Sequence, residues 1–413
     1  MSKLQKFLKS LLPGIFLFGF TVGTGSVTAM AKAGADYGMG LLWAIFLSCA
    51  ITYFLINLFG KFTIVSGETA LQAFRNHLHP AVGWFFVITL TAHVCGSIIG
   101  VMGIIGNVCY EWSKGVIDGG IDPLYFALFF VAVVYLIFLR GNTEVFQNVL
   151  AVFVGIMAIC FLINFLVLTP PLADIAHGMV PNIPEAGSDK NSFLVVASMV
   201  GTTLFSGLFI LRTTLVKEAN WTMADLRIQQ RDALFSGFLM FVVSGSIMAA
   251  AAGTLYVQGV TLTNVTEMIN LLEPLAGPLA VTIFTVGLIA AGVSSQFPNV
   301  ALLPWLLDDY YGRKPNLKRP SYRIIALVMS GLGLVVPIFN AKPIAIMITS
   351  QAFGALVLPA TVACIALLGN RESLMGERRF SLFTNGVLLL VFAFALVMSY
   401  LSFTSIIATL QSI

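Results

Sequence analysis

Long apolar runs constrain the fold of this chain more than any other feature. They recur along the whole sequence, and each is about 20 residues long, the length at which an α-helix crosses a bilayer. Of the 413 residues, 58% are hydrophobic and 10% are charged, whereas about 25% of the residues in a soluble domain are charged. The short alternating segments of a transmembrane β-barrel do not occur. The sequence therefore predicts an all-α polytopic membrane protein whose surroundings are the lipid bilayer.

Eleven apolar runs are long enough to span a membrane. We place the spans at residues 11–32, 40–60, 82–108, 123–140, 146–168, 194–215, 233–257, 276–307, 322–341, 343–368 and 380–404. A long connection between the fifth and sixth spans separates two groups of five. The expected units are a first repeat at 1–168, a loop at 169–193, a second repeat at 194–368, and the last span with the C-terminus at 369–413.

Basic residues predict the orientation of the spans. With the N-terminus in the cytoplasm, 17 Lys and Arg residues fall in inner connections, and only Lys114, Lys190 and Lys342 fall in outer ones. This is the positive-inside bias of membrane proteins. The C-terminus is then outside, and the basic start "MSKLQKFLKS" is interpreted as a cytoplasmic stub rather than a cleaved signal peptide. The compact, loop-poor chain favours a bacterial inner membrane.

Two spans are interrupted near their middles. The first contains "GTGS" at residues 23–26, and the sixth has small residues at the matching place, around Ser206 and Gly207. Lipid cannot bond the backbone N–H and C=O groups that a broken helix leaves free, so such segments face protein or a watery cavity. Two groups of five spans are inverted relative to each other, and paired broken helices in inverted repeats point to a transporter's binding site. The alternative is that the small residues only let helices pack closely.

The first break offers groups of both signs. The second half of the span is expected to begin near Ser26, where free N–H groups and the positive helix end attract an anion. The first half is expected to end near Val22 and Gly23, where free carbonyls suit a cation or an ammonium group. Gly25 lets a ligand approach the backbone closely, and Thr24 adds a hydroxyl group. The break is therefore a candidate site for a small anionic or zwitterionic solute.

Four segments carry a resemblance to a known family. They are "AGADYGMGLLW" (33–43), "GKFTIVSGETALQAF" (60–74), "GLIAAGVSS" (287–295) and "SQAFGALVLP" (350–359). In order and spacing the chain resembles the Nramp family, the natural resistance-associated macrophage proteins, over about residues 11–370. The resemblance implies a LeuT-like fold of the APC superfamily: a 5+5 inverted repeat plus an eleventh helix, with broken helices 1 and 6. It also implies the activity of the family, which is proton-coupled import of manganese and iron.

The metal-binding motifs of that family are not matched in this chain. Aligned on "AGADYG", its Asp-Pro-Gly-Asn falls on residues 23–26, and its Met-Pro-His falls on residues 205–207. Its acidic residue of span three falls on Ser97 and its second His of span six on Arg212. A Mn²⁺ or Fe²⁺ site needs hard ligands, typically with a carboxylate, so we expect the transition-metal site to be lost. The expected substrate-binding residues are Gly23, Thr24, Gly25, Ser26, Phe205, Ser206, Gly207 and Gln351, of which Gln351 matches the Gln of the family's site.

Three residues are candidates for the coupling ion. Ser294 and Ser295 in span eight lie where sodium-coupled carriers of the LeuT-like fold use hydroxyl groups, although Nramp metal importers share these serines. His93 in span three is a candidate proton carrier, because a histidine pKa can be moved through neutrality. Its alternative role is a hydrogen bond to a neighbouring group. The expected coupling ion is therefore H⁺ or Na⁺.

Two basic residues lie within or at the end of a span. Lys32 is a candidate vestibule charge that attracts an anion, and the alternative is an ion pair with Asp36 one helical turn away. Arg212, toward the inner end of span six, is interpreted as an anchor at the inner interface.

The sequence as a whole predicts a secondary active transporter that moves a small solute by alternating access. One alternative is a divalent metal transporter for Mn²⁺, Fe²⁺ or Mg²⁺, of which Mg²⁺ keeps several waters when bound. Another alternative is a non-transporting membrane sensor. An enzyme is not expected, because no Ser/His/Asp, Cys/His or HExxH arrangement and no P-loop occurs. We expect no cofactor, and no nucleic-acid partner because the basic residues are spread over the loops.

Overall fold

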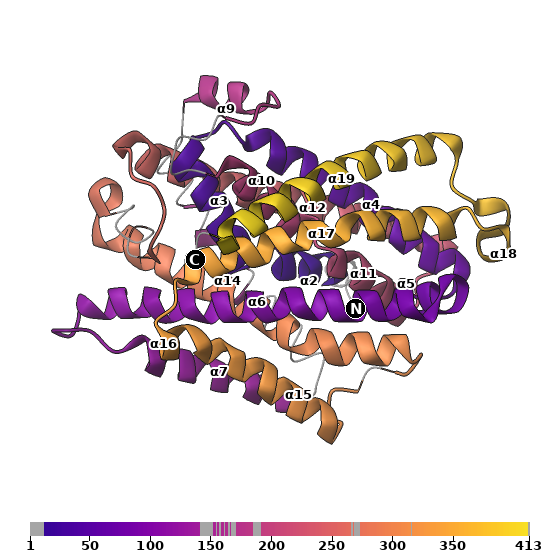
Figure 1. Cartoon of the computed structure of the whole chain (residues 1–413), viewed down its shortest axis with the longest axis horizontal. Helices are drawn as coiled ribbons and strands as arrows, with labels where there is room; N and C mark the ends of the chain where they lie inside the picture. Colours follow the sequence, from indigo (N-terminus) through magenta and orange to yellow (C-terminus); the bar gives the residue numbers. More distant parts are fainter. Residues whose placement is uncertain are drawn as a thin grey trace, which may run out of the picture.

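The described part of this chain is helical throughout (Figure 1). The computed structural model describes residues 12–140, 152–153, 155–156, 158–160, 162–163, 166, 171–184, 191–265, 267, 273–314 and 316–411. Nine helices within these ranges are long and apolar enough to cross a membrane, and a further pair of bent helices brings the number to ten. This agrees with the predicted class. The predicted cytoplasmic stub and most of the predicted fifth span lie outside the described residues.

The membrane-spanning helices begin and end within several residues of the predicted positions. Their bounds are α2 Leu12–Thr21, α3 Thr24–Tyr37, α4 Leu42–Ser66, α6 Pro80–Lys114, α7 Pro123–Arg140, α10 Ser192–Thr203, α11 Ser206–Glu218, α12 Leu226–Ala251, α14 Glu273–Tyr310, α15 Pro320–Gly331, α16 Val335–Phe339, α17 Pro343–Gly369 and α19 Leu382–Gln411. Shorter elements connect them: α5 Ala70–Ala73, η1 Phe74–Leu78, α9 Leu172–Gly178, η2 Met223–Asp225, η3 Ala252–Tyr256, η4 Leu332–Leu334, α18 Glu372–Met375 and η5 Gly376–Arg378.

Both predicted breaks are present. Helices α2 and α3 meet at an angle of 54° across Val22 and Gly23, and α10 is separated from α11 by Leu204 and Phe205. Helix α3 begins at Thr24 rather than at the predicted Ser26. The reason is that Gly23 has an extended backbone and already accepts the first helical hydrogen bond, from the N–H of Val27 (3.0 Å).

The broken helices lie at the centre of the bundle. In the most apolar stretch of α10 and α11, 94% of residues are buried, compared with 17% for α7 and 28% for α19. Figure 1 shows α6, α17 and α19 running along the long axis, with α7 and α15 on the other side of α6. Helix α17 packs against α6, α10 and α19, and α3 packs against α10, α12 and α17. The centre is therefore enclosed by helices that shield the break from lipid.

Glycines allow the central helices to touch through their backbones. A Cβ atom at Gly201 of α10 would lie 2.1 Å from the carbonyl oxygen of Gln351 in α17. A Cβ atom at Gly354 would lie 2.7 Å from the carbonyl oxygen of Gly201. Small residues at such crossings are the usual means of close helix packing in membranes. This contact fixes the position of Gln351 beside the break of the first span.

The predicted loop at 169–193 contains a short helix that the sequence did not indicate. Helix α9 rests on the turn after α3, because a Cβ atom at Gly178 would lie 2.1 Å from the carbonyl oxygen of Met39. The indole N–H of Trp43 donates to the carbonyl oxygen of Asn182 (2.9 Å) and holds the segment after α9. Seven residues are too few for a periodic apolar pattern to be visible in the sequence.

The contact between α10 and α17 predicts the effect of a minimal substitution. We expect Gly201→Ala to lower the free energy of unfolding by about 1–3 kcal/mol, because the new methyl group meets backbone that cannot rotate away. The measurement is the melting temperature of the purified protein in detergent. Gly386→Ala in α19 is the matched control, since no atom lies within 4 Å of its Cβ position. Equal melting temperatures for the two variants would contradict the close packing.

Candidate substrate site

A small cavity with buried walls lies where the two broken spans meet. Its volume is about 20 Å³, which is room for about one water molecule. It is lined by Phe20, Thr21, Gly23, Gly25, Ser26, His93, Ser97, Thr202, Phe205, Ser295, Asn299 and Gln351. These residues come from α2, α3, α6, α10, α14 and α17 and from both breaks. The centre of the bundle thus contains only a very small polar space.

Seven of the residues proposed from the sequence line this cavity. They are Gly23, Gly25, Ser26, His93, Phe205, Ser295 and Gln351. The structure brings them together from five separate segments of the chain, although their roles in binding remain predictions. The other five lining residues, Phe20, Thr21, Ser97, Thr202 and Asn299, were not predicted as site residues. For Phe20, Thr21 and Thr202, closeness to the two breaks along the chain was the available signal.

The break of the first span presents free backbone groups beside the cavity. The N–H groups of Thr24, Gly25 and Ser26 lie in the first turn of α3, where an α-helix offers them no partner. On the other side of the break, the carbonyl oxygen of Gly19 near the end of α2 accepts the hydroxyl of Ser294 (3.4 Å). The cavity therefore has a donor-rich wall at the start of α3.

Gln351 faces the first turn of α3. A Cβ atom at Gly25 would lie 2.3 Å from its side-chain nitrogen, so only glycine admits the amide at this distance. The same nitrogen lies 3.3 Å from the sulfur of Met347, one turn earlier in α17. The position of the Gln351 amide therefore depends on the absence of a side chain at Gly25.

An uncharged pair occupies the place of the family's acidic residue. The side-chain nitrogen of Asn299 donates to the hydroxyl of Ser97 (3.1 Å), and this bond joins α14 to α6 across the cavity wall. Both side chains are buried. Such an interhelical hydrogen bond is a usual role of a polar side chain within membrane helices.

His93 lies against the break of the sixth span. Its ring stacks on that of Phe205, with centroids 4.4 Å apart and planes 22° apart. Phe205 also makes an edge contact with Phe20 (5.5 Å). Nδ1 of His93 is buried without a hydrogen-bond partner, and the backbone carbonyl of His93 accepts from the hydroxyl of Ser350 (3.1 Å). The imidazole is thus held by packing rather than by hydrogen bonds to its nitrogens among the described residues.

The cavity lining contains no carboxylate. Its polar groups are hydroxyls, side-chain amides, an imidazole and the backbone at the breaks. Within the described ranges, no group of three or more His, Cys, Asp or Glu residues is placed to hold a metal ion. Neutral oxygen and nitrogen groups of this kind hydrogen-bond polar solutes, but they do not offset the charge of a dehydrated divalent cation.

Five of the proposed residues lie outside the cavity lining. The hydroxyl of Ser206 accepts from Thr361 of α17 (2.7 Å), and a Cβ atom at Gly207 would meet the ring of Phe205 (2.4 Å). Thr24 is buried beside Gly292, and its hydroxyl has no hydrogen-bond partner. The remaining two are Ser294 and Lys32. Ser294 donates to the carbonyl oxygens of Ala291 in its own helix and Gly19 in α2, and Lys32 pairs with Asp36.

The two basic residues are both held in ion pairs. Lys32 pairs with Asp36 (2.9 Å), which is the alternative considered for it, and also donates to the carbonyl oxygen of Leu262 (2.9 Å). Arg212 pairs with Asp232 of α12, and neither side chain is exposed. The interpretation of Arg212 as an interface anchor is therefore wrong. A carboxylate on the next span, which spacing along one helix cannot reveal, holds it inside the bundle.

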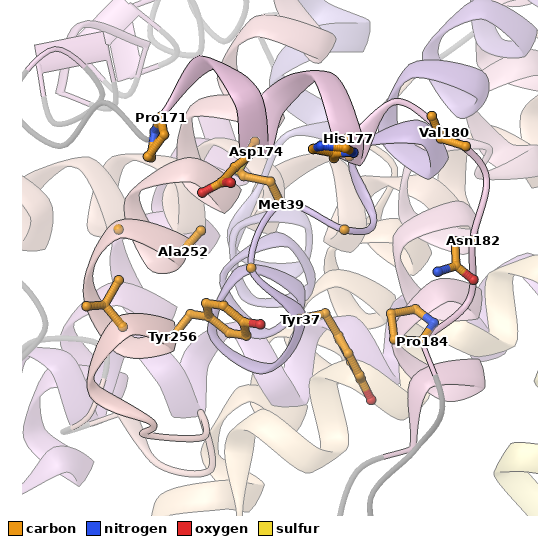
Figure 2. Close-up of a pocket in the computed structure, with 15 residues that line it drawn as sticks. Tyr37, Met39, Pro171, Asp174, His177, Val180, Asn182, Pro184, Ala252 and Tyr256 are labelled. Atoms are coloured by element: carbon orange, nitrogen blue, oxygen red, sulfur yellow. The ribbon is translucent and has the colours of Figure 1, made fainter.

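A larger cavity of about 900 Å³ opens at the far end of α3 (Figure 2). Figure 2 shows Asp174 and His177 of α9 on one wall, with Tyr256 across the space. This cavity shares no lining residue with the small central cavity. It therefore lies outside the predicted site.

The contact between Gly25 and Gln351 can be tested by a double-mutant cycle. We expect Gly25→Ala to lower the melting temperature in detergent, because its methyl group displaces the Gln351 amide. In a Gln351→Ala background the same change has little effect, because the space is then free. An equal decrease in both backgrounds would show that the two residues do not contact each other.

Known proteins resemble this chain over nearly its whole length. The divalent metal cation transporter MntH of Acidiphilium cryptum is 24% identical over 367 residues, which are 85% of this chain and 80% of the relative. A mutant of the Eremococcus coleocola manganese transporter has a TM-score of 0.80 at 17% identity, covering 98% of this chain and 88% of that one. Mhp1, a nucleobase-cation-symport-1 family transporter in a closed conformation, has a TM-score of 0.66 at 14% identity, covering 97% and 90%.

These likenesses confirm the fold that the sequence motifs implied. The solved structures are transporters of the LeuT-like fold, and they match this chain from end to end. The family model described as natural resistance-associated macrophage protein-like matches residues 15–405. The chain is therefore an integral membrane protein that belongs to the Nramp family.

Proposed function

We propose that this Nramp-family chain is a secondary transporter that moves a small solute or ion by alternating access. The observation that carries the proposal is the small buried cavity formed by the ends of two broken spans. Discontinuous helices at the interface of two repeats are the usual construction of substrate sites in such carriers. The cavity has room for about one water molecule, so a substrate enters only when helices move apart.

The comparisons support a divalent metal ion as the substrate better than they support any other. Relatives of this chain carry the name divalent metal cation transporter, and a solved neighbour is a manganese transporter. The cavity offers hydroxyl and amide oxygens from Ser26, Ser97, Asn299 and Gln351. Such oxygens suit a cation that keeps part of its water shell, as Mg²⁺ does.

The lining of the cavity supports a second candidate, a small organic solute that is anionic or zwitterionic. Gly23, Thr24, Gly25 and Ser26 place free N–H groups where the family has Asp-Pro-Gly-Asn, and such groups at a helix start attract a carboxylate. Phe20 and Phe205 add apolar contacts for a carbon skeleton. This candidate rests on the chemistry of the lining alone.

Coupling to an ion is part of the proposal. For Na⁺, the hydroxyl of Ser294 lies 3.4 Å from the carbonyl oxygen of Gly19 in α2, and the hydroxyl of Ser295 lies beside Gly23 in the break. For H⁺, the unpartnered Nδ1 of His93 is a buried nitrogen beside the cavity. We further propose a bacterial inner-membrane location with the N-terminus in the cytoplasm and the C-terminus outside, as the distribution of basic residues predicts.

Ligand binding by the purified protein decides between the two substrates. The melting temperature in detergent is measured with Mn²⁺, Mg²⁺ and Ca²⁺ and with amino acids and small carboxylates, each with and without Na⁺ and at two pH values. A ligand at 100 times its dissociation constant stabilises the folded state by about 2.7 kcal/mol. Stabilisation by micromolar Mn²⁺ supports the first candidate, and stabilisation by an organic solute alone supports the second.

Gly25→Leu tests whether the ligand binds in the cavity. We expect it to remove both the ligand-induced stabilisation and the uptake of that ligand into proteoliposomes, because the leucine side chain fills the space beside Gln351. Gly386→Leu on the lipid-exposed α19 is the control, and it should leave both unchanged. Wild-type uptake by Gly25→Leu would show that the substrate does not pass through this cavity.

A further inference from the structure

A buried carboxylate contacts one half-helix of each broken span. Oδ1 of Asp232 in α12 accepts the backbone N–H of Gly14 in α2 (2.8 Å), and Oδ2 accepts Nη1 of Arg212 in α11. Neither Asp232 nor Arg212 has any exposed side-chain surface. One carboxyl group therefore contacts α2, the first half of the first span, and α11, the second half of the sixth.

Asp232 bonds the backbone near the described start of α2. Gly14 is the third described residue of that helix, and the carboxylate on another span supplies the acceptor for its N–H (2.8 Å). This part of α2 is thus bonded to α12 by tertiary contact.

The fit between α2 and α12 requires glycine. A Cβ atom at Gly14 would lie 2.2 Å from the hydroxyl oxygen of Ser236 and 2.4 Å from Oδ1 of Asp232. Ser236 donates in turn to the backbone carbonyl of Asp232 (2.8 Å), so it belongs to the same contact surface. Any side chain at residue 14 would push α2 away from the carboxylate.

The contacts that hold Arg212 and the Asp232 carboxylate together do not involve α2. Its second terminal nitrogen donates to the carbonyl oxygen of Gln229 (3.3 Å), and its guanidinium lies over the ring of Trp221 (5.1 Å). The side-chain nitrogen of Gln229 donates to the side-chain oxygen of Asn57 in α4 (3.3 Å). These bonds join α11, α12 and α4 without α2. If α2 moves, Asp232 loses a single N–H partner and keeps its counter-ion.

Such a pair is an unusual choice for stability alone. Replacing a buried ion pair by well-packed apolar residues is often neutral or stabilising, so its presence inside a membrane bundle points to a functional role. Opening of the cavity toward this end requires α2 to separate from α11 and α12, because α2 supplies Phe20 and Thr21 to the lining. The Gly14–Asp232 bond must break in that step.

We propose that Asp232, oriented by Arg212, is the docking acceptor for α2 and sets how often the central cavity opens at this end. Both are positioning residues that act through the helix and do not touch the substrate. The inference rests on the proposed alternating access, but it concerns helix movement and not the identity of the solute.

The test measures opening directly with N-ethylmaleimide. Thr21→Cys places a thiol on the cavity wall contributed by α2, in a protein that keeps Cys109 and has its other four cysteines replaced by alanine. We expect Gly14→Ala to raise the labelling rate of the new thiol about tenfold or more, since the methyl group prevents docking. Cys109, buried in α6, reports general loosening and should stay unlabelled. Gly386→Ala is the control and should change neither rate.

A second variant covers the case in which Gly14→Ala does not fold. The double change Arg212→Gln and Asp232→Leu removes both charges and the acceptor of the Gly14 N–H, so no unpaired charge is left buried. The double variant should also raise the labelling rate at residue 21. Arg212→Lys keeps a counter-ion beside an intact Asp232, so its labelling rate should lie between those of the wild type and the double variant. Unchanged labelling in the folded variants, or a parallel rise at Cys109, would overturn the proposal. Because the reagent requires no substrate, either result is independent of the binding and uptake measurements.

Discussion

The free backbone groups at the two helix breaks are the constraint on which the rest of the structure depends. At membrane depth lipid offers them no hydrogen bond, so each break must be covered by other helices. Backbone contact between α10 and α17 at Gly201, and the approach of Gln351 to Gly25, provide that cover. The result is a cavity with room for about one water molecule in the most buried part of the bundle.

Much of this arrangement can be predicted from the sequence, because a helix break has a local cause. Glycines at residues 23 and 25 and small residues at the matching place in span six indicate where two helices stop. The inverted arrangement of the repeats then predicts that the breaks meet. Residues near them, such as Ser26 and Phe205, line one cavity for that reason. The apolar runs similarly predict the described spans, whose ends lie within several residues of the expected ones.

What could not be predicted are partners on other helices. Ser206 was placed in the site because of its neighbours in the sequence, yet its hydroxyl bonds Thr361, 155 residues away. Arg212 was interpreted as an interface anchor because one helix alone shows only its depth, and the position of Asp232 beside it depends on how α11 packs on α12. Periodicity gives the buried face of a helix, but not which side chain of a neighbouring helix lies opposite.

The placement of charge limits what the central cavity can hold. On the broken spans, the partly exposed Lys32 pairs with Asp36 and the buried Arg212 pairs with Asp232, both away from the cavity. The cavity lining itself contains no carboxylate, Lys or Arg. A divalent cation would bring two positive charges into this space, balanced only by water, hydroxyl and amide dipoles. A zwitterion would bring no net charge, and its carboxylate would meet the free N–H groups of α3. The substrate that binds therefore decides the charge of the loaded carrier, and with it the dependence of transport on membrane potential.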